Sequence, residues 1–457
     1  MSRVLPAAAD APSDRRAILA LLHDAGVRRP PLEYEKAHTY PASQPFFGPL
    51  DPSVALAALP GIQGSFWTYV HVPFCNYLCS FCFYRKVLSD SAGSLFPAFL
   101  RGVSRELDQV RMLSGRERIE AHDLYLGGGT PTALTAAQLE ALLDLLGTAL
   151  RPAGDYLGTC EASPESVTVE KASLLLERGI RRISLGGQSF DQRRLDAVRR
   201  AHSVGAIAQA YERLRSAGCD HVNVDLIYGF PGQTCGEWES ELRAALSALL
   251  PESFTLYYLR YVPGTPLANQ ATAADRVPWA ELVAMREAYF DLLFDAGYEM
   301  CRPHFFRLPL DRVRRYRGAP TLDHGNHGRQ IGLGPSAYSH LGSCVSRSAW
   351  PISQWLTAVE QNGFGTAEGR ILTANDRHTR AAVKSLAGTL GIDRRQFQLA
   401  TGADLDKVYG GKLDRLAALG LLRPTETGYQ LTELGILLDE EVSYFLYPGG
   451  FQETPVP

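Results

Sequence analysis

Between Phe66 and Asp295 the chain alternates short apolar runs with longer amphipathic segments six times. The apolar runs have the length and composition of buried β-strands: 66–72, 123–127, 157–162, 182–187, 222–228 and 254–260. The segments between them have apolar residues at helical spacing: around 94–114, 135–150, 168–178, 204–217, 235–249 and 279–296. Strands that alternate with helices pair in parallel, so the pattern predicts an α/β fold made of six βα units, two fewer than a complete eight-fold barrel.

The 457 residues, 45% of them hydrophobic, suffice for two or three domains. We expect an N-terminal extension (1–60), a barrel (61–345) and a C-terminal domain (346–457). The extension has a short helical segment near 13–25, with Ser13 as its N-cap. A proline- and aromatic-rich tract follows over 30–49 and predicts a strap that packs over the barrel or its mouth. The C-terminal pattern predicts helices over 376–390 and 404–419, a hairpin through Gly428 and a helix from Thr432.

Charge and hydropathy exclude several classes of partner. A net charge of −3 and a pI near 6.4 give no general attraction for nucleic acid or anionic membranes. The segment 404–415, a candidate recognition helix, has as many acids as bases, so we expect no DNA binding. No apolar run reaches the roughly 20 residues of a membrane helix. The N-terminal residues lack the apolar centre of a signal peptide, and eight cysteines without a disulfide framework suit a reducing cytoplasm.

Three cysteines, Cys75, Cys79 and Cys82, follow the first predicted strand in the spacing C-x3-C-x2-C. A structural zinc site uses four ligands, and so does an iron–sulfur cluster held by protein alone. Three close thiolates instead fit a [4Fe–4S] cluster with one iron open to a non-protein ligand. The alternative is that three unrelated buried cysteines meet by chance, which the flanking residues disfavour.

The stretch 69–86 closely resembles the cluster loop of the radical S-adenosylmethionine (SAM) enzymes. Its opening Tyr-Val-His-Val-Pro-Phe-Cys resembles their oxygen-independent coproporphyrinogen III oxidase-like group, and the likeness extends over roughly residues 66–445. The resemblance implies a partial (β/α)6 TIM-type barrel and a small helical, winged-helix-like C-terminal domain. It also implies that SAM binds the open iron and that electron transfer cleaves it to methionine and a 5′-deoxyadenosyl radical. We therefore expect an external one-electron reductant of the flavodoxin or ferredoxin type.

Further motifs follow the later strands, at the edge where parallel α/β folds hold their chemistry. Gly128, Gly129 and Thr130 belong to a glycine-rich turn whose backbone can approach a ligand closely. The resemblance assigns this turn to the methionine part of SAM, and we add Tyr69 to the SAM contacts. Glu161 ends an apolar strand, where a bare carboxylate is costly to bury. The resemblance assigns it to the same SAM, whose ribose hydroxyls suit a carboxylate acceptor.

Gln188, Arg200 and Asp225 form a second set of polar residues near strand ends. By themselves they fit a buried amide and a buried acid–arginine pair that serve structure alone. In the group that the chain resembles, the matching residues bind a second SAM molecule beside the first. Phe81, between the cluster cysteines, joins this set, so we expect two SAM molecules.

Two further residues complete the predicted SAM contacts. Arg260 and Tyr338 lie in stretches that shape the remaining SAM contacts in this group, although the side chains there differ from the porphyrinogen oxidase pattern. The polar loop 323–329 has two histidines and could contact substrate or simply be solvated. No residue is assigned to proton transfer.

The reaction is inferred from two departures from the family patterns. Tyr84 stands where authentic coproporphyrinogen dehydrogenases usually have a further cysteine, and residues 324–331 lack the His-Asn-x-x-Tyr-Trp motif of the haem chaperones. We therefore favour a class C radical SAM methylase or cyclopropanase. It would transfer a SAM-derived one-carbon unit to an unsaturated or aromatic carbon of a natural-product-like substrate, with a helper methyltransferase as an optional partner. The alternatives are oxidative decarboxylation of coproporphyrinogen III, anaerobic haem-degrading methyl transfer and a non-catalytic haem-binding chaperone.

Overall fold

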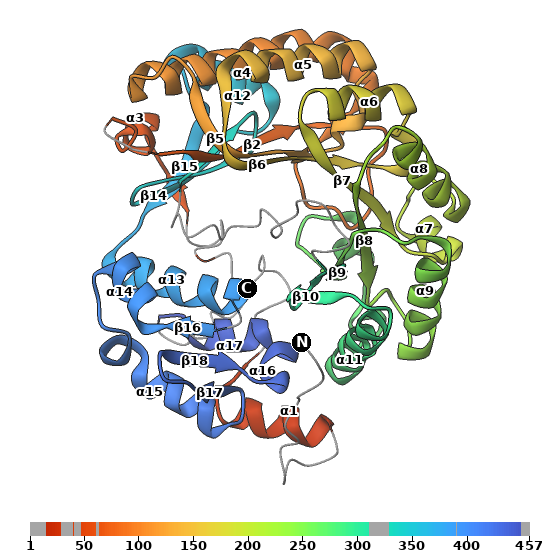
Figure 1. The fold of residues 1–457 in the computed structure, drawn as a ribbon, viewed down its shortest axis with the longest axis vertical. Coiled ribbons are helices and arrows are strands. Elements are labelled where there is room, and N and C mark those ends of the chain that lie inside the picture. Colours follow the sequence, from red (N-terminus) through yellow and green to blue (C-terminus); the bar gives the residue numbers. More distant parts are fainter. Residues whose placement is uncertain are drawn as a thin grey trace.

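A computed structural model describes residues 15–28, 40, 47–60, 64–309, 329–389 and 391–448. One curved sheet of 13 strands runs through the molecule, and helices cover its outer face (Figure 1). The C-terminal region, drawn in blue, lies across the open side of this curve. Among the described residues, no helix is long and apolar enough to cross a membrane.

Six parallel strands form the centre of the sheet: β2 (Phe66–Val72), β5 (Ile119–Gly128), β6 (Leu150–Ala162), β7 (Ile180–Gln188), β8 (His221–Tyr228) and β9 (Ser253–Tyr258). The helices between them are α4 (Ala92–Ser114), α5 (Ala136–Ala149), α6 (Val169–Glu177), α8 (Val204–Ser216), α9 (Cys235–Ala248) and α11 (Trp279–Asp295). The six predicted strands and the six predicted helices are therefore confirmed. Threonine side chains fix two helix starts, because Thr135 and Thr234 each form a reciprocal capping box.

Short strands that the sequence pattern missed extend both edges of the sheet. β12 (Arg329–Leu333) pairs in parallel with β2. Beyond it lie the antiparallel strands β13 (Tyr338–Leu341), β14 (Cys344–Ser348), β15 (Thr366–Ile371) and β1 (Gly48–Pro49). At the other edge, β11 (Phe305–Arg307) and β10 (Glu299–Arg302) continue antiparallel from β9. Since β1 and β10 end the strand order, the sheet is an open, partial barrel, as predicted.

The C-terminal region combines helices with a small sheet in the order β16-β18-β17. Its elements are α13 (Ala374–Thr389), β16 (Gly391–Asp393), α14 (Arg394–Thr401), α15 (Leu405–Ala418), β17 (Leu422–Pro424), β18 (Gly428–Leu431), α16 (Glu433–Leu437) and α17 (Asp439–Phe445). The region has its own apolar core, separate from the large core between the barrel strands and their helices. The predicted helical C-terminal region is therefore confirmed.

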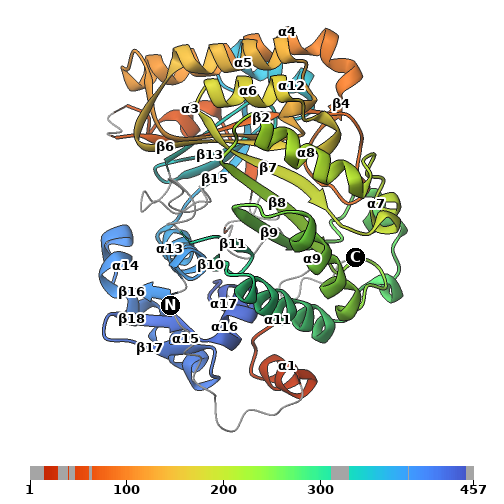
Figure 2. The ribbon, with the colours of Figure 1, turned by 45° about the vertical axis from the view of Figure 1, so that its right-hand side comes forward.

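Helix α1 (Arg15–Asp24) and Tyr40 of the N-terminal extension contact the C-terminal region, whereas β1 joins the large sheet. Leu22 of α1 belongs to the C-terminal core, and Tyr40 Oη donates to Asp376 over 2.6 Å. Figure 2 shows α1 close to α11 and to the C-terminal helices. Ser13 and most of the tract 30–49 lie outside the described residues. The strap and the three domain ranges stay predictions.

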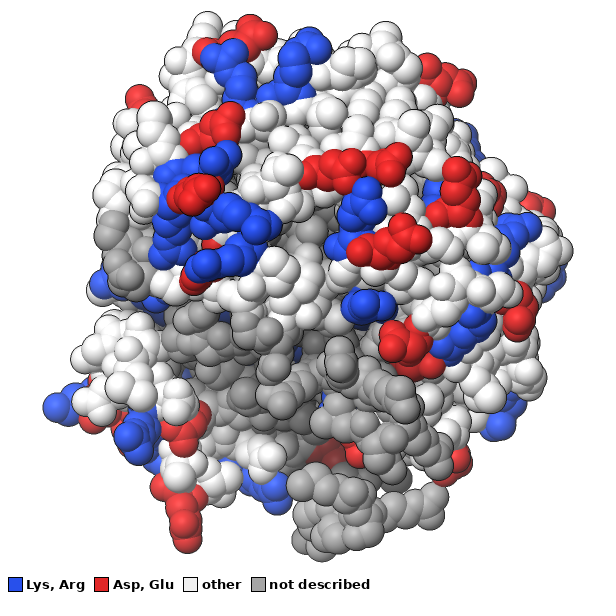
Figure 3. Space-filling view, turned by 45° about the horizontal axis from the view of Figure 1, so that its top comes forward, with Lys and Arg blue, Asp and Glu red and all other residues white. Residues whose placement is uncertain are grey.

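The remaining elements are short connections and one longer helix. They are α3 (Pro52–Leu56), β3 (Phe74–Cys75), β4 (Val87–Leu88), α7 (Gln192–Ala197), α10 (Pro266–Gln270) and α12 (Ile352–Asn362), with single 3-10 turns at 89–91, 131–133, 164–166 and 273–275. On the face drawn in Figure 3, basic side chains gather in a group that acidic side chains interrupt. This face carries no continuous basic stripe of the kind that binds a nucleic-acid backbone.

Candidate functional site

The cysteine loop follows β2, on the side of the barrel where the parallel strands end. Cys75 lies in β3, which pairs with β4 and so closes the loop upon itself. Cys75 and Cys79 are each only 8% exposed, and Cys82 is half-buried. Burial raises the pKa of the Cys75 thiol to about 11. Burial also raises the pKa of Cys79, although the Arg200 guanidinium opposes the shift.

The three cysteines fit a cluster better than a single metal ion. In the described part of the chain, no three Cys, His, Asp or Glu side chains converge closely enough to hold one ion. A [4Fe–4S] cluster does not need such convergence, because each thiolate binds a different iron. Polar groups also surround the loop: Thr130 Oγ1 lies 3.5 Å from Cys75 Sγ, and Lys86 Nζ donates to the Cys82 carbonyl over 2.9 Å. Cluster irons would stabilise the thiolates that burial alone disfavours.

The glycine-rich turn after β5 packs directly against this loop. The amides of Gly129 and Thr130 donate to the carbonyls of Val72 and Phe74 over 2.8 and 2.7 Å. A Cβ at Gly129 would lie only 2.6 Å from the Phe74 carbonyl oxygen, and Gly128 has a positive φ of 104°. Only glycine fits this close approach of two backbones. At Gly128 and Gly129 the turn therefore presents only backbone beside the cysteine loop, while the Thr130 hydroxyl lies next to Cys75.

His71, inside the predicted stretch 69–86, was missed as a site residue. Its Nε2 lies 2.8 Å from the Arg85 carbonyl oxygen, and its ring fills the space beside Gly128. Burial lowers its pKa to about 4, so the ring is neutral near pH 7. His71 thereby ties β2 to the far end of the cysteine loop. Its position within the recognised stretch 69–86 was the sequence signal that could have identified it as a site residue.

Glu161, at the end of β6, faces the glycine turn. Tyr125 Oη donates to one carboxylate oxygen over 2.8 Å, and the Gly128 amide donates to the other over 3.2 Å. Burial raises the pKa of Glu161 to about 7. Tyr69 lies nearby: burial, then the charges of Glu161, Tyr84 and Tyr338, raise its pKa. The structure thus joins Tyr69 to Glu161 through Tyr125, whose ring lies 6.1 Å from that of Tyr69. Tyr338 packs against Gly332, the residue that pairs with Tyr69 in the sheet.

Gln188 and Arg200 converge over Gly186, near the end of β7. A Cβ at Gly186 would lie 2.8 Å from Gln188 Nε2 and 3.3 Å from Arg200 Nη2. Arg200 donates to the Gly186 carbonyl and, through Nη1, to Cys79 Sγ over 3.5 Å. Asp225 pairs with Gly186 in the β7–β8 register. The three predicted residues of the second SAM site therefore lie together, next to the cluster loop.

Asp225 and Phe81 occupy different surroundings within this group. Asp225 accepts hydrogen bonds from Ser184 Oγ over 3.0 Å and Asn223 Nδ2 over 2.8 Å, and burial raises its pKa. Phe81 packs on a small apolar cluster that includes Ile227 and Phe230. The cysteine loop is therefore anchored on the ends of β7 and β8 by apolar as well as polar contacts.

Arg260 lies at the contact between the barrel and the C-terminal region. It forms a buried ion pair with Glu440 of α17 and stacks on Tyr258. A small, partly open pocket adjoins this pair and is lined by residues of β8, β9, α11 and α17. The Arg260 side chain therefore contacts Glu440 and Tyr258, while its neighbours Leu259 and Tyr261 pack in the same cluster as Phe81. A SAM contact of Arg260 stays a prediction. The loop 323–329 lies outside the described residues, except for Arg329.

Three polar residues that sequence reasoning missed surround Arg200. Its guanidinium lies over the Tyr77 ring, 5.1 Å from the centroid, and Tyr77 Oη donates to Glu165 over 3.0 Å. Burial by itself would raise the pKa of Glu165, but hydrogen bonds from His202 and Ser163 outweigh it and hold the pKa at about 2. His202 lies two residues after Arg200, and Glu165 lies four residues after Glu161. Closeness to these recognised motifs was the sequence signal that could have identified them as site residues.

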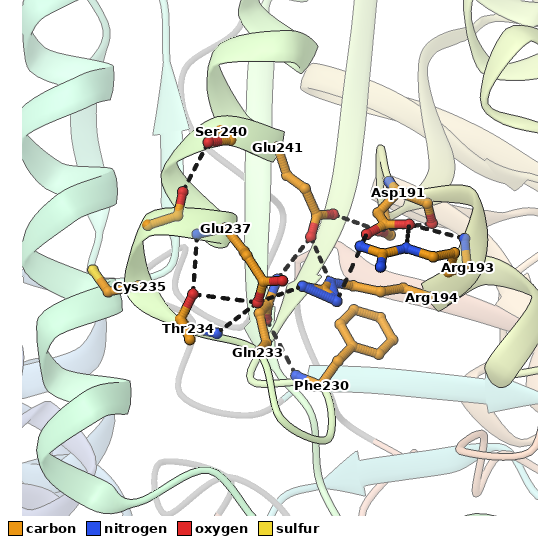
Figure 4. Close-up of polar contacts among 12 residues, drawn as sticks. Asp191, Arg193, Arg194, Phe230, Gln233, Thr234, Cys235, Glu237, Ser240 and Glu241 are labelled. Atoms are coloured by element: carbon orange, nitrogen blue, oxygen red, sulfur yellow. Dashed lines mark hydrogen bonds and ion pairs between the residues drawn. The ribbon is translucent and has the colours of Figure 1, made fainter.

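A second buried network joins the loops that follow β7 and β8 (Figure 4). Glu241 of α9 forms an ion pair with Arg194 at 2.7 Å and accepts from the Phe190 amide at 3.2 Å. Gln233 Nε2 donates to Glu241 over 2.8 Å, while Gln233 Oε1 accepts from the Gly229 amide. The network therefore fixes the chain directly after Gln188 to the chain directly after β8.

Comparison with known proteins agrees with this geometry. Residues 69–245 match the radical SAM superfamily, and residues 372–438 match the HemN C-terminal domain. The heme chaperone HemW of Mycobacterium tuberculosis is 31% identical over 68% of this chain and 75% of its own length. The oxygen-independent coproporphyrinogen III oxidase of Pseudomonas aeruginosa is 29% identical over 90% of this chain and 92% of its own. The structure of coproporphyrinogen III oxidase (HemN) from Escherichia coli, 25% identical, covers 94% of this chain and 98% of its own with a TM-score of 0.78.

These relatives overturn the predicted one-carbon transfer. They match along most of the chain and are named as oxidases and haem chaperones, and none of them is named as a methylase or a cyclopropanase. The prediction was wrong because Gln188, Arg200 and Asp225 bear on which cofactors bind, not on which substrate atom reacts. Tyr84, the other departure on which the prediction relied, is 54% exposed and stacked on Phe83. The chain is a member of the radical SAM superfamily, in its oxygen-independent coproporphyrinogen III oxidase-like group, with a [4Fe–4S] cluster and SAM as its cofactors.

Proposed function

We propose that this chain is a radical SAM enzyme that oxidatively decarboxylates a propionate side chain of a porphyrinogen. The observation that carries the proposal is the extent of the similarity to the Pseudomonas aeruginosa protein named as a coproporphyrinogen III oxidase. That similarity covers 90% of this chain and 92% of the relative, so it includes the barrel and the C-terminal region together. A shared barrel alone would support radical SAM chemistry without indicating a substrate.

The residues present fit the cofactors of such a reaction. Cys75, Cys79 and Cys82 would hold the cluster, and the glycine turn with Glu161 would bind SAM. A second SAM molecule would lie against Phe81 and the group formed by Gln188, Arg200 and Asp225. When bound and reduced, the cluster and SAM supply a carbon radical that removes a hydrogen atom from the substrate.

The protein's own part is to bind, orient and exclude water. Glu161 already accepts from Tyr125 and Gly128 at fixed positions, so its remaining acceptor sites are directed before a ribose hydroxyl arrives. Asp225 is held in the same way by Ser184 and Asn223. In the proposed reaction the propionate loses a hydrogen atom, carbon dioxide and one electron, which leaves a vinyl group. The electron passes to an external acceptor. A separate cytoplasmic reductant of the flavodoxin or ferredoxin type supplies the cluster with the electron that starts the reaction.

Mass analysis of the product tests the proposal. The reconstituted protein is mixed anaerobically with dithionite, SAM and coproporphyrinogen III. We expect 5′-deoxyadenosine and a product that lacks carbon dioxide and two hydrogens for each propionate converted. Cys79→Ala should lose the cluster and both products. An unchanged porphyrinogen alongside efficient SAM cleavage in its presence would contradict the substrate assignment.

Haem binding by a chaperone is the second candidate. It is supported by the 31% identity to the Mycobacterium tuberculosis protein named as a heme chaperone and by Tyr84 at a position where authentic coproporphyrinogen dehydrogenases usually have a cysteine. Titration of the purified protein with haem, followed by absorbance, separates the two functions. Stoichiometric haem binding without a decarboxylated product would favour the chaperone.

A further inference from the structure

Arg200 links the cluster loop to the neighbouring group around Gly186. Its Nη1 donates to Cys79 Sγ over 3.5 Å, and its Nη2 donates to the Gly186 carbonyl. Cys79 is 8% exposed, so water does little to solvate the sulfur at this point. The guanidinium therefore provides a fixed positive charge at one of the three cluster ligands.

The surroundings of Arg200 hold the guanidinium in place. The Tyr77 ring lies beneath it, at 5.1 Å from the centroid, and Glu165 fixes that ring through a 3.0 Å hydrogen bond. His202 Nδ1 lies 3.7 Å from the same carboxylate, and its Nε2 lies 3.1 Å from the Gly187 carbonyl oxygen. The strand that binds Arg200 through Gly186 thus binds His202 through the next residue. Such a supported cation loses little entropy when it bonds a thiolate.

A hydrogen bond to a ligand sulfur changes the electron affinity of an iron–sulfur cluster. One-electron reduction adds negative charge to the cluster and its thiolates. A nearby cation that donates to a thiolate stabilises the reduced form more than the oxidised form. Arg200 meets both conditions, because it is charged at all ordinary pH values and contacts Cys79 directly.

We propose that Arg200 raises the reduction potential of the cluster through its hydrogen bond to Cys79. In this role it acts on the electron-transfer step, in addition to the ligand contact that the family resemblance implies. The inference rests on the cluster of the radical SAM superfamily and does not depend on the porphyrinogen substrate. It also gives Tyr77 and Glu165 a function, which is to position the guanidinium.

The test is a redox titration of the reconstituted protein, followed by the electron paramagnetic resonance signal of the reduced cluster, without SAM or substrate. Arg200→Gln should shift the midpoint potential to a more negative value at unchanged iron and sulfide content. Arg199→Gln is the matched control, because it removes an equal charge from the adjacent exposed residue, and it should leave the potential near that of the unaltered protein. Equal potentials for the Arg200→Gln variant and the unaltered protein would overturn the proposal.

A second variant covers the case in which Arg200→Gln fails to hold a cluster. Tyr77→Leu removes the ring beneath the guanidinium but leaves Arg200 and all three cysteines in place. We expect a smaller negative shift in the midpoint potential, because the guanidinium is then less firmly held. An unchanged potential in this variant, with a full cluster, would count against the proposal. Since no substrate is present, neither result bears on decarboxylation, and failure of one proposal is distinguishable from failure of the other.

Discussion

Arg260 and Glu440 form a buried ion pair that joins the barrel to the C-terminal region, with Arg260 Nη2 2.6 Å from Glu440 Oε1. Tyr258 Oη donates to the other carboxylate oxygen over 3.0 Å. Beside this pair, Arg286 of α11 donates to the Leu437 carbonyl and lies 3.5 Å from Asp439. Tyr258 ends β9, Arg260 follows it and Arg286 lies in α11, whereas their partners in α16 and at the start of α17 lie 151 to 182 positions later. The two regions are therefore held together by polar contacts from which water is largely excluded.

Glu440→Ala should destabilise the fold strongly. Removing one partner of a buried pair leaves the other charge unpaired, which costs about 3–5 kcal/mol. Urea unfolding of the two proteins measures the difference. Asp406→Asn is the control, because it breaks the exposed ion pair between Arg394 and Asp406 in the same region. Exposed pairs contribute little, so the control should unfold near the midpoint of the unaltered protein. Similar midpoints for all three proteins would contradict the importance of the buried pair.

Gly129→Ala should disrupt SAM binding while Gly147→Ala should not. A Cβ at Gly129 would lie 2.6 Å from the Phe74 carbonyl oxygen and 2.7 Å from that of Val72, so the turn must move away from the cysteine loop. At Gly147, in α5, a Cβ has no neighbour within 4 Å, and alanine favours a helix over glycine by about 1 kcal/mol. Equilibrium dialysis with SAM compares the reconstituted variants. Equal SAM affinity in both would argue against the turn as a binding element.

Glu161 should make the stability of the metal-free protein depend on pH. Burial raises its folded-state pKa from 4.5 to about 7, so between these values the folded chain binds a proton that the unfolded chain has lost. Stability therefore falls as the pH rises through this range, by at most about 1.4 kcal/mol per pH unit, and levels off above about pH 7.

Glu161→Gln should reduce this slope. Glu106 contributes a similar term, because burial also raises its pKa to about 7. The informative quantity is therefore the difference in slope between Glu161→Gln and the unaltered protein, measured by urea unfolding at several pH values. Parallel slopes would show that Glu161 keeps an ordinary pKa.

The sequence patterns predicted the six parallel strands well because each is a continuous apolar run. β2 was predicted over its observed range, 66–72, and β8 within one residue. β12 was missed because its five residues include a glycine, and its place depends on pairing with β2 some 260 residues earlier. Local patterns do not contain that pairing.

The same limit applies to the site. The cysteines were predicted because their spacing is local, whereas Tyr77 and Glu165 meet across 88 positions and gave no pattern. Arg260 was expected beside SAM because its stretch shapes SAM contacts in the family that the chain resembles. The residue that determines its neighbourhood, Glu440, lies 180 positions later. The motifs identified the cofactors because a cluster and SAM need particular ligand residues at particular sequence spacings. A substrate requires no comparable spacing of residues, so the motifs did not identify the reaction, and the predicted reaction was wrong.

Glu241→Ala should weaken binding at the proposed second SAM site, although Glu241 is not one of the residues assigned to that site. Glu241 forms an ion pair with Arg194 and accepts a hydrogen bond from Gln233 (Figure 4). It also accepts hydrogen bonds from Ser189 Oγ and the Phe190 amide. These contacts hold the chain just after Gln188, whose φ of 69° is one that non-glycine residues rarely adopt. With the carboxylate removed, Arg194 and Gln233 lose a buried partner, and the loop can relax from this conformation.

We expect faster proteolysis at the loops after β7 and β8, together with lower SAM occupancy, while the cluster content stays normal. Glu237→Gln is the matched control, since Glu237 lies on the same helix and also pairs with Arg194, at 3.0 Å, but is 45% exposed. Water can replace the lost contact there, so the control should bind SAM as the unaltered protein does. If both variants lost SAM to the same degree, charge on α9 would matter and the buried network would not.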